Sequence, residues 1–132
     1  MSRSMLEQGR AAYAYEQVRD FMSSKPETVS KEYRSYLKKM PAMVQMNGLG
    51  ETLAFYYAKD ETHRDIYFQV IRWLQRKYGK QLLGNNESEA LHAILRMDSP
   101  DYRVMSMEVV ALVNWMRRFA DGFSKAGEGA KS

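Results

Sequence analysis

The strongest constraint on the fold is the spacing of apolar residues near the end of the chain. From residue 102 to residue 123, large apolar side chains recur at alternating steps of three and four: Tyr102, Met105, Val109, Leu112, Met116, Phe119 and Phe123. This spacing places them on one face of an α-helix of about six turns. Directly before it, Ser99-Pro100-Asp101 supplies a capping hydroxyl, a proline at the first helical position and an acid in the first turn. The sequence therefore predicts a long amphipathic helix that other helices must cover.

The same spacing recurs upstream, and no stretch alternates with the period of two that is typical of a half-buried strand. In chain order, one helix is expected over residues 5–23, a second from Thr28 or Ser30, and a third over residues 50–59. Two more should begin after caps at Thr62 and at Asn86. Pro41 should kink or split the helix that begins at Thr28 or Ser30. We expect an all-α, single-domain bundle of about five to six helices over residues 1–132, with a disordered tail at roughly 126–132, where nothing can be buried.

A central helical hairpin is predicted around residues 30–59. Asn47-Gly48-Leu49-Gly50 separates two apolar helical runs, and glycine readily adopts the positive φ at which a helix ends. The helical spacing places Tyr15, Phe55 and Phe119 in the core. Met46 and Met107 lie off the main apolar stripes and are candidates for a surface that faces a partner.

Composition limits the cellular context. The chain of 132 residues has no cysteine, so it has no disulfide framework and no thiolate metal site, which is compatible with a reducing cytoplasm. It shows no signal-peptide pattern and no apolar run of membrane-spanning length. We expect a soluble cytoplasmic protein that makes no membrane contact.

The usual signatures of an active site are missing. His63 and His92 stand 29 positions apart without a partner at metal-ligand spacing, and both are expected to be solvated or hydrogen-bonded histidines. The segment 47–50 lacks the Gly-Lys-Ser/Thr ending of a phosphate-binding loop. The sequence therefore predicts a protein that is not an enzyme, with no catalytic residue, metal site or cofactor.

Basic residues form two stripes at helical spacing, within a net charge of +4. The first stripe comprises Lys31, Arg34, Lys38 and Lys39, and the second comprises Arg72, Arg76, Lys77 and Lys80. Either stripe alone is commonly a solvated helix face. If the two converge in the fold, they form a track for a phosphate backbone. These eight residues are therefore the candidate RNA-binding residues.

One part of the chain resembles a known family. Its motifs are Tyr33-Arg34-Ser35, then Lys38-Lys39-Met40-Pro41, then Asn47-Gly48-Leu49-Gly50 running into Leu53-Ala54-Phe55. In this order they resemble the signature of the small all-helical subunit of the Cmr complex. That complex is the type III-B CRISPR effector, which silences RNA under the direction of a guide RNA. The chain departs from the pattern in its methionines at 40, 43 and 46, where leucine or isoleucine is expected, and in Glu51, where glutamine is common.

The resemblance implies a non-catalytic structural subunit that acts in antiviral defence. Such subunits stack with sister copies into a minor filament, beside the backbone subunit and the large subunit, and help to hold target RNA against the guide RNA. Two alternatives stay open. A free-standing helical nucleic-acid-binding module would need a polar recognition helix after Asn47-Gly48, where the sequence is apolar instead. A plain protein adaptor is favoured if the two basic stripes face opposite ways.

Overall fold

The computed structural model describes the backbone of residues 3–131, and the side chains of residue 5 and of residues 7–125. Within residues 3–131 the chain forms seven helices and no strand: α1 (Arg3–Ser24), α2 (Glu27–Asn47), α3 (Leu49–Lys59), α4 (Glu61–Tyr78), α5 (Lys80–Leu83), α6 (Glu87–Leu95) and α7 (Ser99–Lys131). The prediction of an all-α fold is confirmed. The number exceeds five to six because α5 is a separate turn of four residues between two glycines with positive φ. None of these helices is both long and apolar enough to cross a membrane.

The predicted tail at 126–132 falls mostly outside what the structure describes. The backbone of α7 is helical to Lys131, whereas Ser132 and the side chains from residue 126 onward lie outside the described residues. The disorder of this segment therefore stays a prediction.

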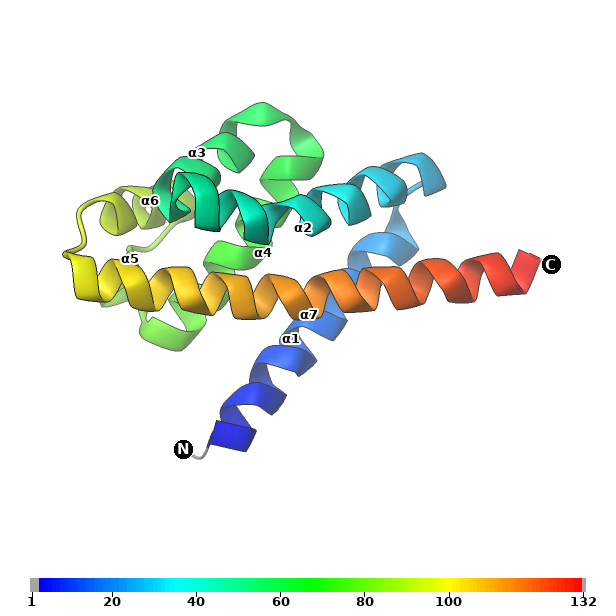
Figure 1. The fold of residues 1–132 in the computed structure, drawn as a ribbon, viewed down its shortest axis with the longest axis horizontal. Helices are drawn as coiled ribbons and strands as arrows, with labels where there is room; N and C mark the ends of the chain where they lie inside the picture. Colours follow the sequence, from blue (N-terminus) through cyan, green and yellow to red (C-terminus); the bar gives the residue numbers. More distant parts are fainter. Residues whose placement is uncertain (1–2, 132) are drawn as a thin grey trace.

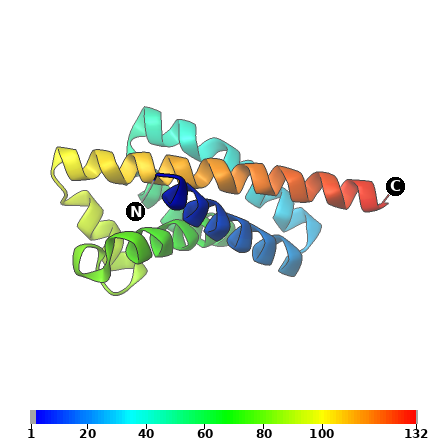
Figure 2. The same cartoon turned by 90° about the horizontal axis from the view of Figure 1, so that it is seen from below.

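The long helix α7 is the element around which the others are arranged (Figure 1). Helix α2 lies beside α7 and runs in the opposite direction, and α1 crosses α7 (Figures 1 and 2). Helices α3 to α6 gather around the N-terminal half of α7. The apolar stripe of α7 is covered as its spacing required, since Met105, Val109, Leu112 and Met116 are all buried.

The hairpin predicted around residues 30–59 is formed by α2 and α3. Gly48 alone connects the two helices, with φ 89° and ψ 158°, a region that is almost restricted to glycine. Helix α3 folds back on α2, and the Tyr56 hydroxyl donates to the Tyr36 carbonyl at 2.6 Å. The expected turn at 47–50 is shorter than predicted, because Leu49 and Gly50 already belong to α3.

Gly50 packs closely against α6 and α7. A side-chain carbon added there would lie 2.6 Å from Leu95 Cδ2, and the Gly50 N–H donates to the Tyr102 hydroxyl at 2.7 Å. This hydrogen bond ties the start of α3 to the start of α7.

The helix boundaries confirm some predicted caps and correct others. Asn86 caps α6 as predicted, with its side chain accepting from the Glu89 N–H at 2.9 Å. The predicted cap at Thr62 is wrong: Asp60 caps α4 by accepting from the His63 N–H at 2.9 Å, which lowers the pKa of Asp60. Helix α2 passes through Pro41 without being split.

The core also contains a buried polar group that joins three helices. Gln69 of α4 is 6% exposed, and its side-chain oxygen accepts from the Tyr33 hydroxyl of α2 at 2.9 Å. The Gln69 backbone carbonyl accepts from the Tyr13 hydroxyl of α1 at 2.6 Å. These bonds fix which side of α2 faces α4, because Tyr33 must point at Gln69.

The predicted core aromatics are only partly correct. Phe119 packs against the core, but Tyr15 and Phe55 are each 41% exposed. Tyr15 lies on the flank of α7, edge-on to Phe119 at 5.3 Å, and Phe55 lies on the solvent side of α3, which is apolar nearly all round. Of the methionines assigned to a partner-facing surface, Met46 is 82% and Met107 is 67% exposed. Both therefore lie outside the core, as their spacing indicated.

Thr52 of α3 offers a test of the core. Its side chain is fully buried, and its hydroxyl has no hydrogen-bond partner among the residues that the structure describes. We expect Thr52→Val to leave the free energy of unfolding unchanged or to raise it by up to about 1 kcal/mol, because an unpaired buried hydroxyl is replaced by an apolar group of the same shape. Urea denaturation would measure this, with the exposed Thr28→Val as the control. A loss of more than about 1 kcal/mol would show that the hydroxyl is paired in solution.

Candidate nucleic-acid interface

The first basic stripe lies on the flank of α2 beside the C-terminal half of α7. Lys31, Lys38 and Lys39 are exposed. Arg34 is half-buried and donates from Nε to Asp121 Oδ1 at 2.6 Å, and this hydrogen bond lowers the pKa of Asp121. Since Tyr33 points at α4, these basic residues are directed to the other side of α2. The first stripe therefore lies on the surface, and one of its four charged side chains, Arg34, forms an ion pair.

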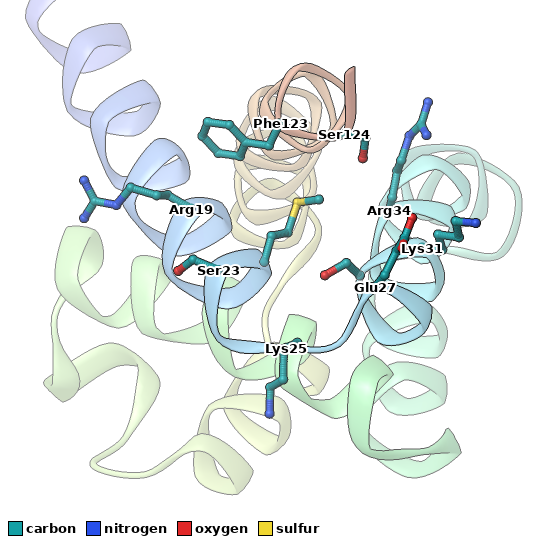
Figure 3. Close-up of a pocket in the computed structure, with 10 residues that line it drawn as sticks. Arg19, Ser23, Lys25, Glu27, Lys31, Arg34, Phe123 and Ser124 are labelled. Carbon is teal, nitrogen blue, oxygen red and sulfur yellow. The ribbon is translucent and has the colours of Figure 1, made fainter. Parts of the chain in front are cut away.

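A cleft of about 420 Å³ opens next to this stripe, between the end of α1, the start of α2 and the C-terminal half of α7 (Figure 3). Four basic residues line it: Lys31 and Arg34 from the stripe, and Arg19 and Lys25 from α1 and its exit. Sequence reasoning missed Arg19 and Lys25. Lys25 did carry a signal, because it directly precedes Pro26 in the short connection to α2 and must lie close to the start of the stripe in any fold.

The second basic stripe lies along the exposed side of α4 and continues into α5. Arg72, Arg76 and Lys80 are exposed. Arg72 approaches Glu87 of α6 at 3.4 Å, and its guanidinium lies 5.4 Å from the centre of the Phe68 ring. Lys77 differs from the other three, because its ammonium group turns inward and donates to Glu108 of α7.

Glu108 is the centre of a buried charge cluster that the sequence reasoning did not identify. It is 4% exposed, and Arg10 of α1 donates to both of its oxygens, at 2.7 and 2.8 Å. The indole N–H of Trp73 donates to it at 2.8 Å, and Lys77 is its third donor. Burial alone would raise the pKa of Glu108, but the hydrogen bonds from Arg10, Lys77 and Trp73 lower it to about 2.

The cluster assigns Lys77 a structural contact instead of a free surface charge. The signal available in the sequence was an acid inside the apolar stripe of α7, since residue 108 falls between Met105 and Val109 on the same helix face. An acid at such a position needs buried basic partners.

The two basic stripes are anchored at different points along α7. The first is anchored to α7 at Asp121, and the second at Glu108, which is 13 residues earlier on the same helix. At 1.5 Å per residue, these anchors are about 20 Å apart along α7. The second stripe is also tied to α6 through Glu87, whereas the first borders the cleft. That both stripes serve one RNA track therefore stays a prediction.

The remaining candidates for chemistry have structural surroundings. His63 is 6% exposed, its Nδ1 lies 2.9 Å from Asp60 Oδ1, and its ring stacks on Tyr36 with centroids 3.7 Å apart. It is the hydrogen-bonded histidine that the sequence indicated, while His92 is exposed. Among the described residues, no group of three or more His, Cys, Asp or Glu side chains is placed to hold a metal ion.

Comparisons with known proteins match most of the chain. The model of a family described as CRISPR-associated protein (Cas_Cmr5) matches residues 6–123, which include both stripes, Glu108 and all of the cleft lining except Ser124. Among solved structures, the chain is similar to the crystal structure of a CRISPR-associated Cmr5 family protein from Thermus thermophilus. The TM-score is 0.71 at 28% sequence identity, over 88% of this chain and 95% of that one.

Proposed function

Because this chain belongs to the Cmr5 family of CRISPR-associated proteins, we propose that it is the non-catalytic, structural small subunit of a type III-B Cmr effector, acting in the cytoplasm in antiviral defence. The observation that carries the proposal is the family match over residues 6–123, together with a shared fold over 95% of the Thermus chain. In this role the chain stacks with sister copies beside the backbone subunit and the large subunit, and helps to hold target RNA against the guide RNA.

The first stripe and the cleft are the surfaces that best support an RNA contact. Lys31, Lys38 and Lys39 are exposed and lie on one side of the molecule with the basic cleft lining. Lysine side chains that contact phosphate add affinity without base preference, which suits a subunit in an assembly whose specificity comes from guide pairing. In the second stripe, Arg72, Arg76 and Lys80 remain candidates, whereas Lys77 is occupied by Glu108.

A plain adaptor role within the complex is the second candidate. The anchoring of the two stripes about 20 Å apart along α7 favours it, because two separate basic surfaces can contact two protein neighbours. A free-standing DNA-binding module is disfavoured, since Leu49, Leu53 and Tyr56 of α3 are buried in the core and cannot enter a DNA groove.

Native purification through a tag on this chain tests the proposal. Guide RNA and the larger Cmr subunits should co-purify in fixed ratio with it. Recovery of the chain without RNA or Cmr subunits, from cells that express the whole complex, would contradict the proposed function.

Charge reversal in the reconstituted complex separates the RNA contact from the adaptor role. Lys31, Lys38 and Lys39 changed together to Glu should reduce the salt dependence of target-RNA binding by roughly one counterion for each lost phosphate contact, equally for all target sequences. The matched triple reversal of Arg72, Arg76 and Lys80 tests the second stripe without disturbing Glu108. The variant and wild-type complexes that are compared must contain each subunit in the same number. If both variants assemble and bind RNA with unchanged affinity and salt slope, the adaptor role is correct and the RNA contact is wrong.

A further inference from the structure

The cleft between α1, α2 and α7 has an unusual combination of lining groups. Its four basic residues, Arg19, Lys25, Lys31 and Arg34, face a single acid, Glu27, so the lining carries four positive charges against one negative. Arg19 is paired with Asp20 at 3.0 Å and Arg34 with Asp121 at 2.6 Å. The Arg19–Asp20 pair is largely exposed, and such pairs contribute little and exchange readily for another anion.

The charges surround the mouth of the cleft, and its interior is apolar. In Figure 3 the charged ends of Arg19, Lys25 and Lys31 point outward in different directions around the cleft, and the Phe123 ring projects from α7 toward α1 at its edge. The interior is completed by Met22 and by the serines at 23, 30 and 124. Phe123 is held by Tyr15, whose ring meets it edge-on at 5.4 Å.

This distribution suits a ligand with a flat, apolar part that enters the cleft and an anionic part that stays at its mouth. An unstacked nucleobase has an aromatic face for Phe123 and heteroatoms on its edge for the serine hydroxyls, and the adjoining phosphates reach the basic rim. An acidic segment such as oligoglutamate would satisfy the rim, but it has no aromatic face to stack on Phe123. The volume of about 420 Å³ is within the range of small-ligand sites, roughly 300–1,000 Å³.

We propose that this cleft binds one unpaired nucleotide of a single RNA strand, with its base against Phe123 and the flanking phosphates on Arg19, Lys25 and Lys31. The inference rests on the proposed function for the choice of RNA as the anionic partner. It adds that the strand is engaged where it is single, because a base that is paired and stacked in a duplex cannot enter a cleft without loss of that pairing.

Amide NMR of the full chain, titrated with a short oligouridylate, tests the proposal. We expect shift changes centred on residues 22–34 and 119–124, and much weaker changes with the same strand annealed to its complement. Phe123→Ala should weaken binding about 5- to 150-fold, the range found when a stacking aromatic is removed. Lys25→Gln and Arg19→Gln should each lower the salt slope by about 0.7.

Matched controls lie outside the cleft. Lys59→Gln removes an exposed charge of α3 that belongs to neither stripe, and Phe55→Ala removes a phenylalanine that is 41% exposed on the same helix; neither should change binding. Phe123→Leu keeps an apolar side chain in place without a flat ring, so it gives the same test if the alanine variant unfolds.

Three outcomes would overturn the inference: no shift changes at the cleft, equal binding of strand and duplex, or equal competition by an oligoglutamate peptide. The last outcome would identify a site for an acidic protein segment. Each of these leaves the co-purification result unaffected, so a failure of the cleft proposal is distinguishable from a failure of the proposed function.

Discussion

Replacement of Glu108 by alanine should lower the free energy of unfolding by about 3–5 kcal/mol, because it leaves two cations without their shared buried anion. Arg10 and Lys77 both donate to Glu108, and the Trp73 indole loses its acceptor as well. The cluster joins α1, α4 and α7, so its loss weakens the packing of three helices together. Chemical denaturation followed by circular dichroism would measure the change.

Two further variants isolate the charge from the cavity. Glu108→Gln keeps the shape of the side chain and removes the charge, so it should cost less than Glu108→Ala. Glu16→Ala removes an exposed glutamate of α1 and should change the unfolding free energy by no more than about 0.5 kcal/mol. A Glu108→Ala variant as stable as the Glu16→Ala variant would show that the cluster does not contribute to stability.

The same cluster sets a dependence of stability on pH. The pKa of Glu108 is lowered from the ordinary value of 4.5 to about 2, so the folded state binds the proton less well than the unfolded state does. This contribution is fully present above pH 4.5 and is lost as the pH falls from there toward about 2. Wild-type protein should therefore lose more stability over this interval than Glu108→Gln, which has no carboxyl group to titrate at that position.

Gly48→Val should lower the free energy of unfolding by about 3 kcal/mol. Backbone strain accounts for most of this loss, because a β-branched residue does not tolerate φ 89° with ψ 158°. A side-chain carbon at residue 48 would also lie 3.2 Å from the Tyr102 hydroxyl and would disturb its hydrogen bond with Gly50. The melting temperature and the denaturant midpoint would both report the effect.

Two other glycines provide controls for this prediction. Gly122 lies inside α7 with nothing within 4 Å of an added side-chain carbon, so Gly122→Ala should stabilise the helix by about 0.5–1 kcal/mol. Gly79 has φ 94° and equally open surroundings, so Gly79→Ala measures backbone strain without a steric contact. An unchanged melting temperature for Gly48→Val would mean that the connection between α2 and α3 can adopt another conformation.

The fold could be predicted from local pattern because its helices carry their own start and stop signals. The apolar spacing located α7, and Gly48 located the break between α2 and α3. Thr62, with an acid three residues later, resembles a capping box, but Asp60 two residues before it is also a good capping residue and is the one that caps α4. Spacing alone does not choose between two adjacent caps.

The candidate site could be predicted only as far as single helices allow. Helical spacing showed that Lys31, Arg34 and Lys38 share a face of α2, but the direction of that face depends on the contact between Tyr33 and Gln69. The role of Lys77 depends on Glu108, which is 31 residues away in sequence. Tyr15 and Phe55 were misplaced for the same reason, because a helix that is apolar on several sides does not reveal which side its neighbours cover.

The crossing of α1 with α7 has a consequence for the order in which the chain acquires its structure during synthesis. Arg10 and Glu108 are 98 residues apart, so their contact cannot form until the ribosome has released nearly the whole chain. Helices α2 to α4 contact near neighbours in sequence and can assemble earlier. In the meantime Ala14 and Val18 of α1, both fully buried in the finished fold, stay exposed. If translation pauses before α7 emerges, the apolar face of α1 therefore stays uncovered. A chain in this state is bound by chaperones and is prone to aggregate.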